Sequence, residues 1–266
     1  MTQRLEGKVA IITGAGCVGP GWGNGRSMAY RFIEEGAHVF AVDIDESALT
    51  ETIEKCEGLG GQLITHICDA TRSNAVLKMV DTCVESFGRL DILVNNVGGS
   101  RRGGPVQLSE EDWDSQIDYN LKTVFLGCKN ALPHMERLGG GSIINIASTS
   151  GIRWSGSAQV AYAATKAGVI QLSRVVAVEY AAKRIRVNSI LPGQLHTPMV
   201  EARLAGQRTG GDVDMLLKQR QARIPLGFMG DGRDTANAAV FLASEEARFI
   251  TGTEIIVDGG MTARCD

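Results

Sequence analysis

Short apolar runs alternate with longer amphipathic stretches from one end of the chain to the other. Val9–Thr13 is a nearly continuous apolar run, which is typical of a strand buried on both faces of a parallel sheet. From Arg26 to Glu35, apolar residues recur at helical spacing, and Gly36 then suits the end of a helix. This alternation predicts an α/β fold, a single-domain Rossmann-type doubly wound parallel sheet with helices on both faces.

The remaining elements follow the same rhythm. Further strands are expected at His38–Val42, Leu63–Cys68, Ile92–Asn95, Ser142–Ala147, Arg186–Leu191 and Glu254–Val257. Further helices are expected at Glu46–Glu57, Ser73–Phe87, Trp113–Ala131, Ala161–Tyr180, Asp212–Arg223 and Arg233–Ala243. Since no linker interrupts the pattern, we expect residues 1–266 to form one dinucleotide-binding and catalytic domain.

The stretch Pro192–Gly232 is the longest irregular part of the chain. It follows the expected strand Arg186–Leu191 and is expected to be irregular up to about Gly211. Open α/β sheets bind ligands at the carboxyl ends of their strands, and long loops there often cover the ligand. Residues 192–232 are therefore expected to cover a substrate.

Composition and charge narrow the classes of function. Apolar residues make up 44% of the 266 residues, which fits a globular domain with a sizeable core. A net charge of −3 without a long basic run argues against a nucleic-acid partner. No apolar run approaches the roughly 18 residues of a membrane span, so no membrane partner is expected.

The cysteines carry no sign of a metal site. Six are present, without a Cys-x-x-Cys pair and without a histidine at metal-ligand spacing. The N-terminus is also unlike a secretory signal, because its first apolar run comes too early and is too short. Reduced thiols in a cytoplasmic protein without a metal are the expectation.

The segment TGAGCVGPGWGNG, which starts at Thr13, contains a formal Gly-x-Gly-x-x-Gly match at Gly14, Gly16 and Gly19. A glycine loop that holds a phosphate ends where a helix begins, because the helix supplies free N–H groups. Helical periodicity begins only at about Asn24–Arg26, and Pro20 interrupts any earlier start. The formal match is therefore interpreted as accidental.

A second set of glycines fits a phosphate loop better. Gly14 lies at the strand end, Gly23-Asn24-Gly25 lies at the helix start, and an enlarged loop joins them. Gly14 permits a tight turn, while Gly23 and Gly25 allow close approach of backbone to a pyrophosphate and of helix to strand. An ordinary glycine-rich surface loop is the alternative.

Asp43 follows the second strand, where an acidic side chain can accept hydrogen bonds from an adenosine ribose. A 2′-phosphate would meet like charge there, and no Arg or Lys directly follows in DIDES. This pattern favours NAD(H) over NADP(H). In the alternative reading Asp43 only caps the next helix, although Asp45 can fill that role.

A series of short motifs continues along the chain. They are the TG…GNG loop, CDAT, NNVG, DYNLKTVF, IINIAS, YAATK, LPGQLHTP and TGTEIIVDGG. In this order they make the chain resemble the short-chain dehydrogenase/reductase family over nearly its whole length. The resemblance implies a nicotinamide cofactor, a small-molecule alcohol or ketone substrate, and a homotetramer in which the closing strand packs at a subunit interface.

The resemblance also implies two sets of functional residues. The catalytic set is Asn120, Ser148, Tyr162 and Lys166. The cofactor-binding set is Gly14, Gly23, Asn24, Gly25, Asp43, Asp69, Ala70, Asn95, Val97, Gly98, Tyr162, Lys166, Pro192, Gly193, Leu195 and Thr197. By the same resemblance, Lys166 holds the nicotinamide ribose, Ser148 donates to the substrate oxygen, and Asn120 holds a water.

Two departures from the family pattern stand out. The enlarged glycine loop leaves open which amides reach the pyrophosphate. The segment between Ser148 and Tyr162 is one residue longer than usual, so Thr149 competes for the serine role. Ser148 is preferred because it directly follows the apolar strand.

Tyr162 and Lys166 are four residues apart on an expected helix, so both project from one face. A free tyrosine has a pKa of about 10 and is a poor base near neutral pH. A neighbouring ammonium favours the phenolate. Tyr162 is therefore expected to take the proton of an alcohol, or to donate it to a carbonyl oxygen in reverse.

The substrate pocket is expected to include Ser148, Trp154, Gln159, Gln194 and Met199. The pair Arg101-Arg102 follows the fourth strand near the expected cleft. It could attract an anionic substrate, but we favour a solvated surface pair.

The sequence therefore predicts an NAD(H)-dependent oxidoreductase that interconverts a secondary alcohol and a ketone by hydride transfer. An NADPH-dependent 3-oxoacyl carrier-protein reductase is the nearest alternative, and Asp43 argues against it. A catalytically silent nucleotide-binding relative is the alternative from another class. The presence of all four catalytic residues argues against that reading.

Overall fold

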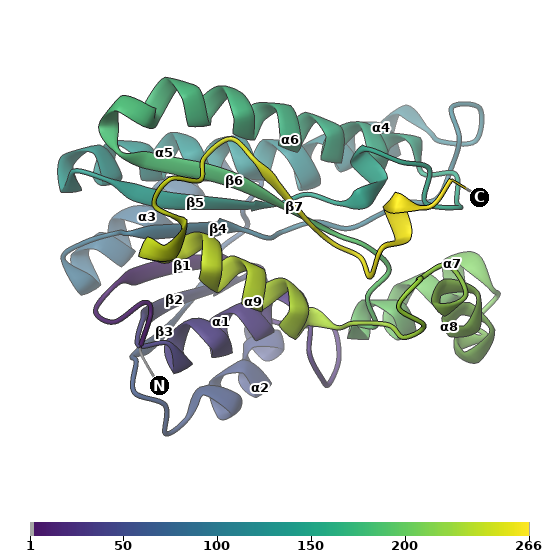
Figure 1. Ribbon diagram of the computed structural model, residues 1–266, viewed down its shortest axis with the longest axis horizontal. Coiled ribbons are helices and arrows are strands. Elements are labelled where there is room, and N and C mark those ends of the chain that lie inside the picture. The colour runs from purple at the N-terminus through teal and green to yellow at the C-terminus, as the bar shows by residue number, and fades with distance from the viewer. Residues whose placement is uncertain (1–2, 266) are drawn as a thin grey trace.

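The computed structural model describes residues 3–265 and is built on one seven-stranded parallel sheet (Figure 1). The strands lie in the order β3-β2-β1-β4-β5-β6-β7. They are β1 (Val9–Thr13), β2 (His38–Asp43), β3 (Leu63–Ile67), β4 (Ile92–Asn95), β5 (Gly141–Ile146), β6 (Ile185–Pro192) and β7 (Glu254–Val257). Every strand pairing is parallel, as the alternating pattern predicts.

Nine α-helices are present within the described residues. They are α1 (Asn24–Glu34), α2 (Glu46–Cys56), α3 (Ser73–Phe87), α4 (Glu110–Ile117), α5 (Thr123–Leu138), α6 (Val160–Tyr180), α7 (Ala205–Arg208), α8 (Val213–Gln221) and α9 (Gly232–Ala243). Across residues 3–265, no helix has both the length and the apolar character to cross a membrane.

The helices form two layers, one on each face of the sheet (Figure 1). Ile11 points into a core with α3, α5 and α6. Its neighbours Ala10 and Ile12 point into a second core with α1, α2 and α9. Because successive strand residues face opposite sides, a strand covered on both faces is apolar throughout, which is the pattern of β1. The predicted doubly wound sheet is confirmed.

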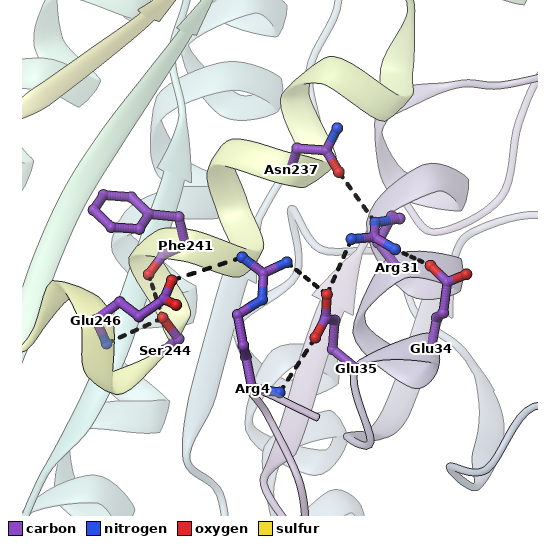
Figure 2. A network of polar contacts seen from close by, with 8 residues as sticks. All are labelled: Arg4, Arg31, Glu34, Glu35, Asn237, Phe241, Ser244 and Glu246. Carbon is purple, nitrogen blue, oxygen red and sulfur yellow. Dashed lines mark hydrogen bonds and ion pairs between the residues drawn. The ribbon is translucent and has the colours of Figure 1, made fainter. Parts of the chain in front are cut away.

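Polar contacts join the N-terminal segment to Glu35, which follows α1, and to Glu246, which lies shortly after α9 (Figure 2). Arg4 donates to Glu35 over 2.5 Å and lies 3.7 Å from Glu246. Arg31, on α1, donates through Nε to the Asn237 side chain on α9 over 3.1 Å. These contacts lie at the edge of the α1–α9 interface and away from the carboxyl ends of the strands.

The predicted helix Trp113–Ala131 is wrong in its boundaries and its continuity. α4 begins at Glu110, where Ser109 caps it by accepting a hydrogen bond from Asp112 N. A π-helical turn at Asp118–Lys122 then separates α4 from α5. Such turns insert one extra residue and are frequent at functional sites.

The segment after β6 is less irregular than expected. A π-helical turn at Val200–Leu204 leads into α7, so the predicted absence of helix before Gly211 is wrong. Val200, Ala205 and Leu216 form a small core of their own. Figure 1 places α7 and α8 apart from both helix layers, beyond one end of the sheet. This segment therefore stands over the carboxyl ends of the strands, since it directly follows β6.

Candidate active site

A cavity of about 680 Å³ opens at the carboxyl ends of the strands. It lies where the strand order reverses, because β1 pairs with β2 on one side and with β4 on the other. Ligands of open α/β sheets bind at this switch point. The predicted residues that line the cavity are Gly14, Gly23, Asn24, Gly25, Asp43, Asp69, Ala70, Val97, Gly98, Ser148, Tyr162, Lys166, Pro192, Gly193, Leu195, Thr197 and Met199.

Asn95 is placed away from this cavity. Its side chain is buried between β4 and β5 and donates to Asn145 Oδ1 over 2.8 Å. The next residue, Asn96, lines the cavity instead and donates to the carbonyls of Thr13 and Gly14. The NNVG motif therefore contributes Asn96 to the cavity wall and Asn95 to the core, a division that the sequence analysis missed.

Three of the predicted pocket residues do not line the cavity. Trp154 is 76% exposed. Gln159 is buried and donates to the hydroxyls of Ser150 and Ser155, over 2.8 and 2.7 Å. Gln194 is also buried and donates to the carbonyl of Ser155 over 3.2 Å. These glutamines stabilise the loop before α6. Of the five predicted pocket residues, Ser148 and Met199 line the cavity.

The glycine loop ends at Gly23, where the interpretation with Gly14 and Gly23-Asn24-Gly25 predicts the start of the helix. Gly23 is the N-cap of α1 and Asn24 is its first residue. Gly14 has φ +64°, which favours glycine. A Cβ added to Gly25 would come within 1.8 Å of the Gly14 carbonyl oxygen. Gly23, Asn24 and Gly25 also line the cavity, and because the first amides of a helix have no partner within the helix, the start of α1 offers hydrogen-bond donors there.

The inserted part of the loop is fixed by Arg26, which the sequence analysis did not single out. This arginine is 2% exposed although it lies in the first turn of a helix. Its Nη1 donates to the carbonyl of Gly21 over 2.7 Å and pairs with Glu51 over 2.5 Å. Gly21 N in turn donates to Glu51 over 3.1 Å.

The same loop touches both ends of the segment after β6. A Cβ on Gly19 would lie 3.5 Å from Pro198 Cβ, so these residues are neighbours. Gly232 N, at the start of α9, donates to the carbonyl of Trp22 over 3.3 Å. The Trp22 ring lies beneath the guanidinium of Arg233, which is 5.5 Å from the ring centroid.

The structure shows that Asp45, and not Asp43, caps α2. Asp45 caps α2 by accepting from Ser47 N over 2.9 Å. Asp43 lines the cavity and accepts from the amides of Gly16 and Ile44, over 3.0 and 2.8 Å. Asp43 is therefore not the helix cap. Its carboxylate lies beside the glycine loop.

Tyr162 and Lys166 lie on one face of α6 and share the cavity. Lys166 Nζ is 5.8 Å from the Tyr162 ring centroid and donates to the carbonyl of Ile146 over 2.7 Å. Burial lowers the pKa of Lys166 to about 8, because the ammonium loses its water. A Cβ on Gly98 would come within 3.0 Å of Nζ, so a glycine leaves the room that Lys166 occupies.

Asn120 is fully buried within the π-helical turn, behind the cavity wall. Its Oδ1 accepts from Gly99 N over 2.9 Å, and its Nδ2 donates to the Gly99 carbonyl over 3.1 Å. Nδ2 also lies within hydrogen-bonding distance of the Gln116 carbonyl, at 3.2 Å. Asn120 thus holds the loop after β4 against the π-helical turn. This loop includes Gly98, which lies beside Lys166 Nζ.

Ser148 and Thr149 differ in their access to the cavity. Ser148 is part of the cavity wall, and its hydroxyl accepts from Ser150 N over 3.1 Å. Thr149 is 2% exposed and its hydroxyl donates to the Pro192 carbonyl. The geometry therefore favours Ser148 for the serine role.

The thiols and acids do not form a metal-binding group in the part of the chain that is described. Within residues 3–265, no cluster of three or more His, Cys, Asp or Glu side chains could hold an ion. Burial raises the pKa of Cys56 and of Cys68 to about 11, and of Cys83 to about 12, so these thiols stay protonated.

A glycine-lined cavity at the switch point, with a tyrosine and a lysine four residues apart, is the arrangement expected of a nicotinamide-dependent oxidoreductase of the Rossmann type. A family model described as Enoyl-(Acyl carrier protein) reductase matches residues 20–262. A solved structure of a putative short-chain dehydrogenase/reductase from Burkholderia xenovorans is 63% identical, with a TM-score of 0.95 and 99% coverage of both chains.

Curated relatives span the same length. The 3-oxoacyl-(acyl-carrier-protein) reductase FabG of Thermotoga maritima is 38% identical, covering 97% of this chain and 99% of that protein. The 3beta-hydroxysteroid dehydrogenase 1 of Eggerthella lenta is also 38% identical, covering 98% and 96%. The chain belongs to the short-chain dehydrogenase/reductase family and is an oxidoreductase of that family. Its relatives differ in their substrates, so family membership leaves the substrate open.

Proposed function

We propose that the protein is an NAD(H)-dependent oxidoreductase that interconverts a secondary alcohol and a ketone, within one dinucleotide-binding and catalytic domain. The observation that carries the proposal is that Tyr162 and Lys166 line the same cavity as Gly14, Gly25 and Asp43. The cavity fits a dinucleotide, because the close contact of Gly25 with Gly14 turns the N-terminus of α1 toward it.

A nicotinamide held by these residues would supply the hydride acceptor for an alcohol, or the hydride donor for a ketone. Tyr162 takes the alcohol proton, or gives it to the carbonyl oxygen in reverse. Lys166 carries an ammonium below about pH 8, which favours the phenolate of its neighbour. Ser148 donates a hydrogen bond to the substrate oxygen, and Asn120 fixes the loop that forms the wall behind Lys166.

The preference for NAD(H) rests on Asp43. Its carboxylate faces the cavity at the end of β2. The next two residues are Ile44 and Asp45, so no Lys or Arg directly follows. A 2′-phosphate placed there would meet like charge. The similarity to a 3-oxoacyl-(acyl-carrier-protein) reductase supports the rival proposal of an NADPH-dependent carrier-protein reductase.

Residues 192–232 are proposed to cover the substrate, since Leu195, Thr197 and Met199 already line the cavity. A homotetramer is proposed from the apolar surface on α5 and α6, where Phe125, Val175 and Val178 are 51%, 55% and 79% exposed. A cytoplasmic location fits the six cysteines, which are all unpaired.

Fluorescence titration of NADH and NADPH tests the cofactor assignment in the unmodified protein and in Asp43→Ala. We expect at least a tenfold preference for NADH, which the substitution removes. A preference for NADPH in the unmodified protein would favour the carrier-protein reductase. Failure to bind either cofactor would favour a catalytically silent relative.

A further inference from the structure

A second cavity of about 550 Å³ adjoins the first, on the side of α4 and α7. The two cavities share wall residues, among them Tyr119, Met199 and Arg203. Ser115 and Gln207 line only the second. A substrate whose carbonyl lies near Tyr162 therefore has room to extend past Tyr119 beneath the segment after β6.

Arg203 stands at the junction of these two cavities. It lies in the π-helical turn Val200–Leu204, and within residues 3–265 its guanidinium has no hydrogen-bond or ion-pair partner. The other arginines near this opening are occupied. Arg101 pairs with Asp112 over 2.6 Å, and Arg102 donates to the Gln207 carbonyl over 3.0 Å.

The acids that line either cavity already have hydrogen-bond or ion-pair partners. Asp43, Asp45 and Asp69 follow β2 and β3 and accept from backbone amides. Asp118 pairs with Lys122 over 3.0 Å. None of the described wall residues places an unpaired carboxylate beside Arg203.

A second arginine adds positive charge to the same wall. Arg220 is 7% exposed, lines the first cavity from α8, and donates to the Leu195 carbonyl over 3.1 Å. Lys166 lines the same cavity from α6. Positive groups in a recess with low-dielectric walls raise the local concentration of anions, although the whole chain carries a net charge of −3.

We propose that the substrate is a keto acid or hydroxy acid whose carboxylate is bound by Arg203, with its carbonyl or hydroxyl carbon at Tyr162. This assignment rests on the function proposed above and names the class of its substrate. A guanidinium binds a carboxylate through two parallel hydrogen bonds. One unpaired guanidinium matches a single negative charge, so a carboxylate fits this position better than a phosphate dianion.

The test compares acids with their methyl esters, which lack the negative charge and carry one additional methyl group. The probes are 4-oxopentanoate, 5-oxohexanoate and the two methyl esters. Dissociation constants are measured calorimetrically without cofactor and with NAD⁺, which cannot reduce a ketone, and kcat/KM is measured with NADH. The variants are Arg203→Met, Arg203→Lys and, as the matched control, Arg153→Met. Arg153 is exposed on the loop before α6 and lines neither cavity.

We expect at least one acid to bind the unmodified protein tenfold or more tightly than its ester. Arg203→Met should lower that acid-to-ester ratio at least tenfold, Arg203→Lys should retain part of it, and Arg153→Met should leave it unchanged. Equal binding of acids and esters by the unmodified protein would overturn the proposal. So would an unchanged ratio in Arg203→Met.

The affinity for NADH distinguishes a failure of the proposed oxidoreductase function from a failure of the carboxylate assignment to Arg203. If Arg203→Met weakens NADH binding and leaves the acid-to-ester ratio unchanged, Arg203 serves the cofactor diphosphate and the substrate assignment is overturned. If the unmodified protein does not bind NADH, the proposed function fails. The ratio of acid to ester affinity without NADH then still decides the role of Arg203.

Discussion

Arg26 and Glu51 together hold both polar groups of the Gly21 peptide backbone. The arginine donates to the Gly21 carbonyl over 2.7 Å, the glutamate accepts from the Gly21 amide over 3.1 Å, and the two side chains lie 2.5 Å apart. The enlarged glycine loop is therefore a folded insertion around an ion pair whose arginine is buried.

Arg26→Met is expected to destabilise the fold. Removing one partner of a buried pair costs about 3–5 kcal/mol when the other partner is left buried without a counter-charge. Glu51 is 28% exposed and keeps Lys55 at 3.2 Å, so we expect a smaller fall in the free energy of unfolding, about 1–2 kcal/mol, from the lost hydrogen bonds of Arg26 to the loop, as measured by urea denaturation. Lys8→Met, which removes a surface pair with Glu245, should change it by less than about 1 kcal/mol. Equal effects of the two substitutions would contradict a structural role of the Arg26–Glu51 pair.

Gly25→Ala should abolish the cofactor site. The added methyl group would lie 1.8 Å from the Gly14 carbonyl oxygen, so the start of α1 must move away from β1. We expect NADH affinity to fall at least a hundredfold in a fluorescence titration. Gly60→Ala is the matched control, since a Cβ there would make only an ordinary contact of 3.7 Å with Gln3. An NADH affinity equal to that of the unmodified protein would show that cofactor binding does not depend on the close approach of Gly25 to Gly14.

Lys166→Met should change stability in a way that depends on pH. Burial lowers the pKa of Lys166 from 10.5 to about 8. Below pH 8 the folded and unfolded chains both hold the proton, so the folded protein carries the full penalty of a buried ammonium. Between pH 8 and 10.5 the unfolded chain holds more protons, and the stability of the unmodified protein rises relative to the variant.

Urea denaturation at pH 7, 8, 9 and 10 measures this difference. The stability of Lys166→Met relative to the unmodified protein should be greatest at pH 7 and should decrease from pH 8 upward. A difference that stays constant across this range would mean that the Lys166 pKa is not lowered by burial.

Tyr162→Phe should retain NADH binding and lose most of the catalytic activity. The ring stays in place beside Lys166, but the hydroxyl that transfers the proton is gone. We expect kcat to fall about 10²–10⁴-fold with little change in the dissociation constant of NADH. Tyr119→Phe provides the comparison, since Tyr119 lines the same cavity from the π-helical turn. A Tyr162→Phe enzyme with normal kcat would assign proton transfer to another group.

The order of strands and helices was predictable because each element carries its own periodicity. β1, β2, β4 and α3 lie within one residue of their predicted ends. The π-helical turn at Asp118–Lys122 was not predictable in this way. The turn contains no glycine or proline that would mark a break, and the partly buried hydrogen bonds of Asn120 to Gly99 connect segments 21 residues apart.

The candidate site was predictable where residues end strands or begin helices. Asp43, Ser148 and Gly25 occupy the cavity because the sheet brings these ends together. Gln159 and Gln194 do not line the cavity, because the direction of a loop side chain depends on contacts distant in sequence, here with Ser155. The role of Arg26 was not predictable for the same reason. The local sequence places it in the first turn of a helix, but its burial depends on contacts with the loop and with Glu51.

The contacts of Gly19 with Pro198 and of Trp22 with Gly232 have a consequence for protein engineering. A shorter glycine loop grafted from a relative would leave both ends of residues 192–232 without the surface that they now touch. Chimaeras that aim to alter cofactor use alone are therefore expected to disturb the cover of the cavity as well. The two segments form a single exchangeable module and should be transplanted together.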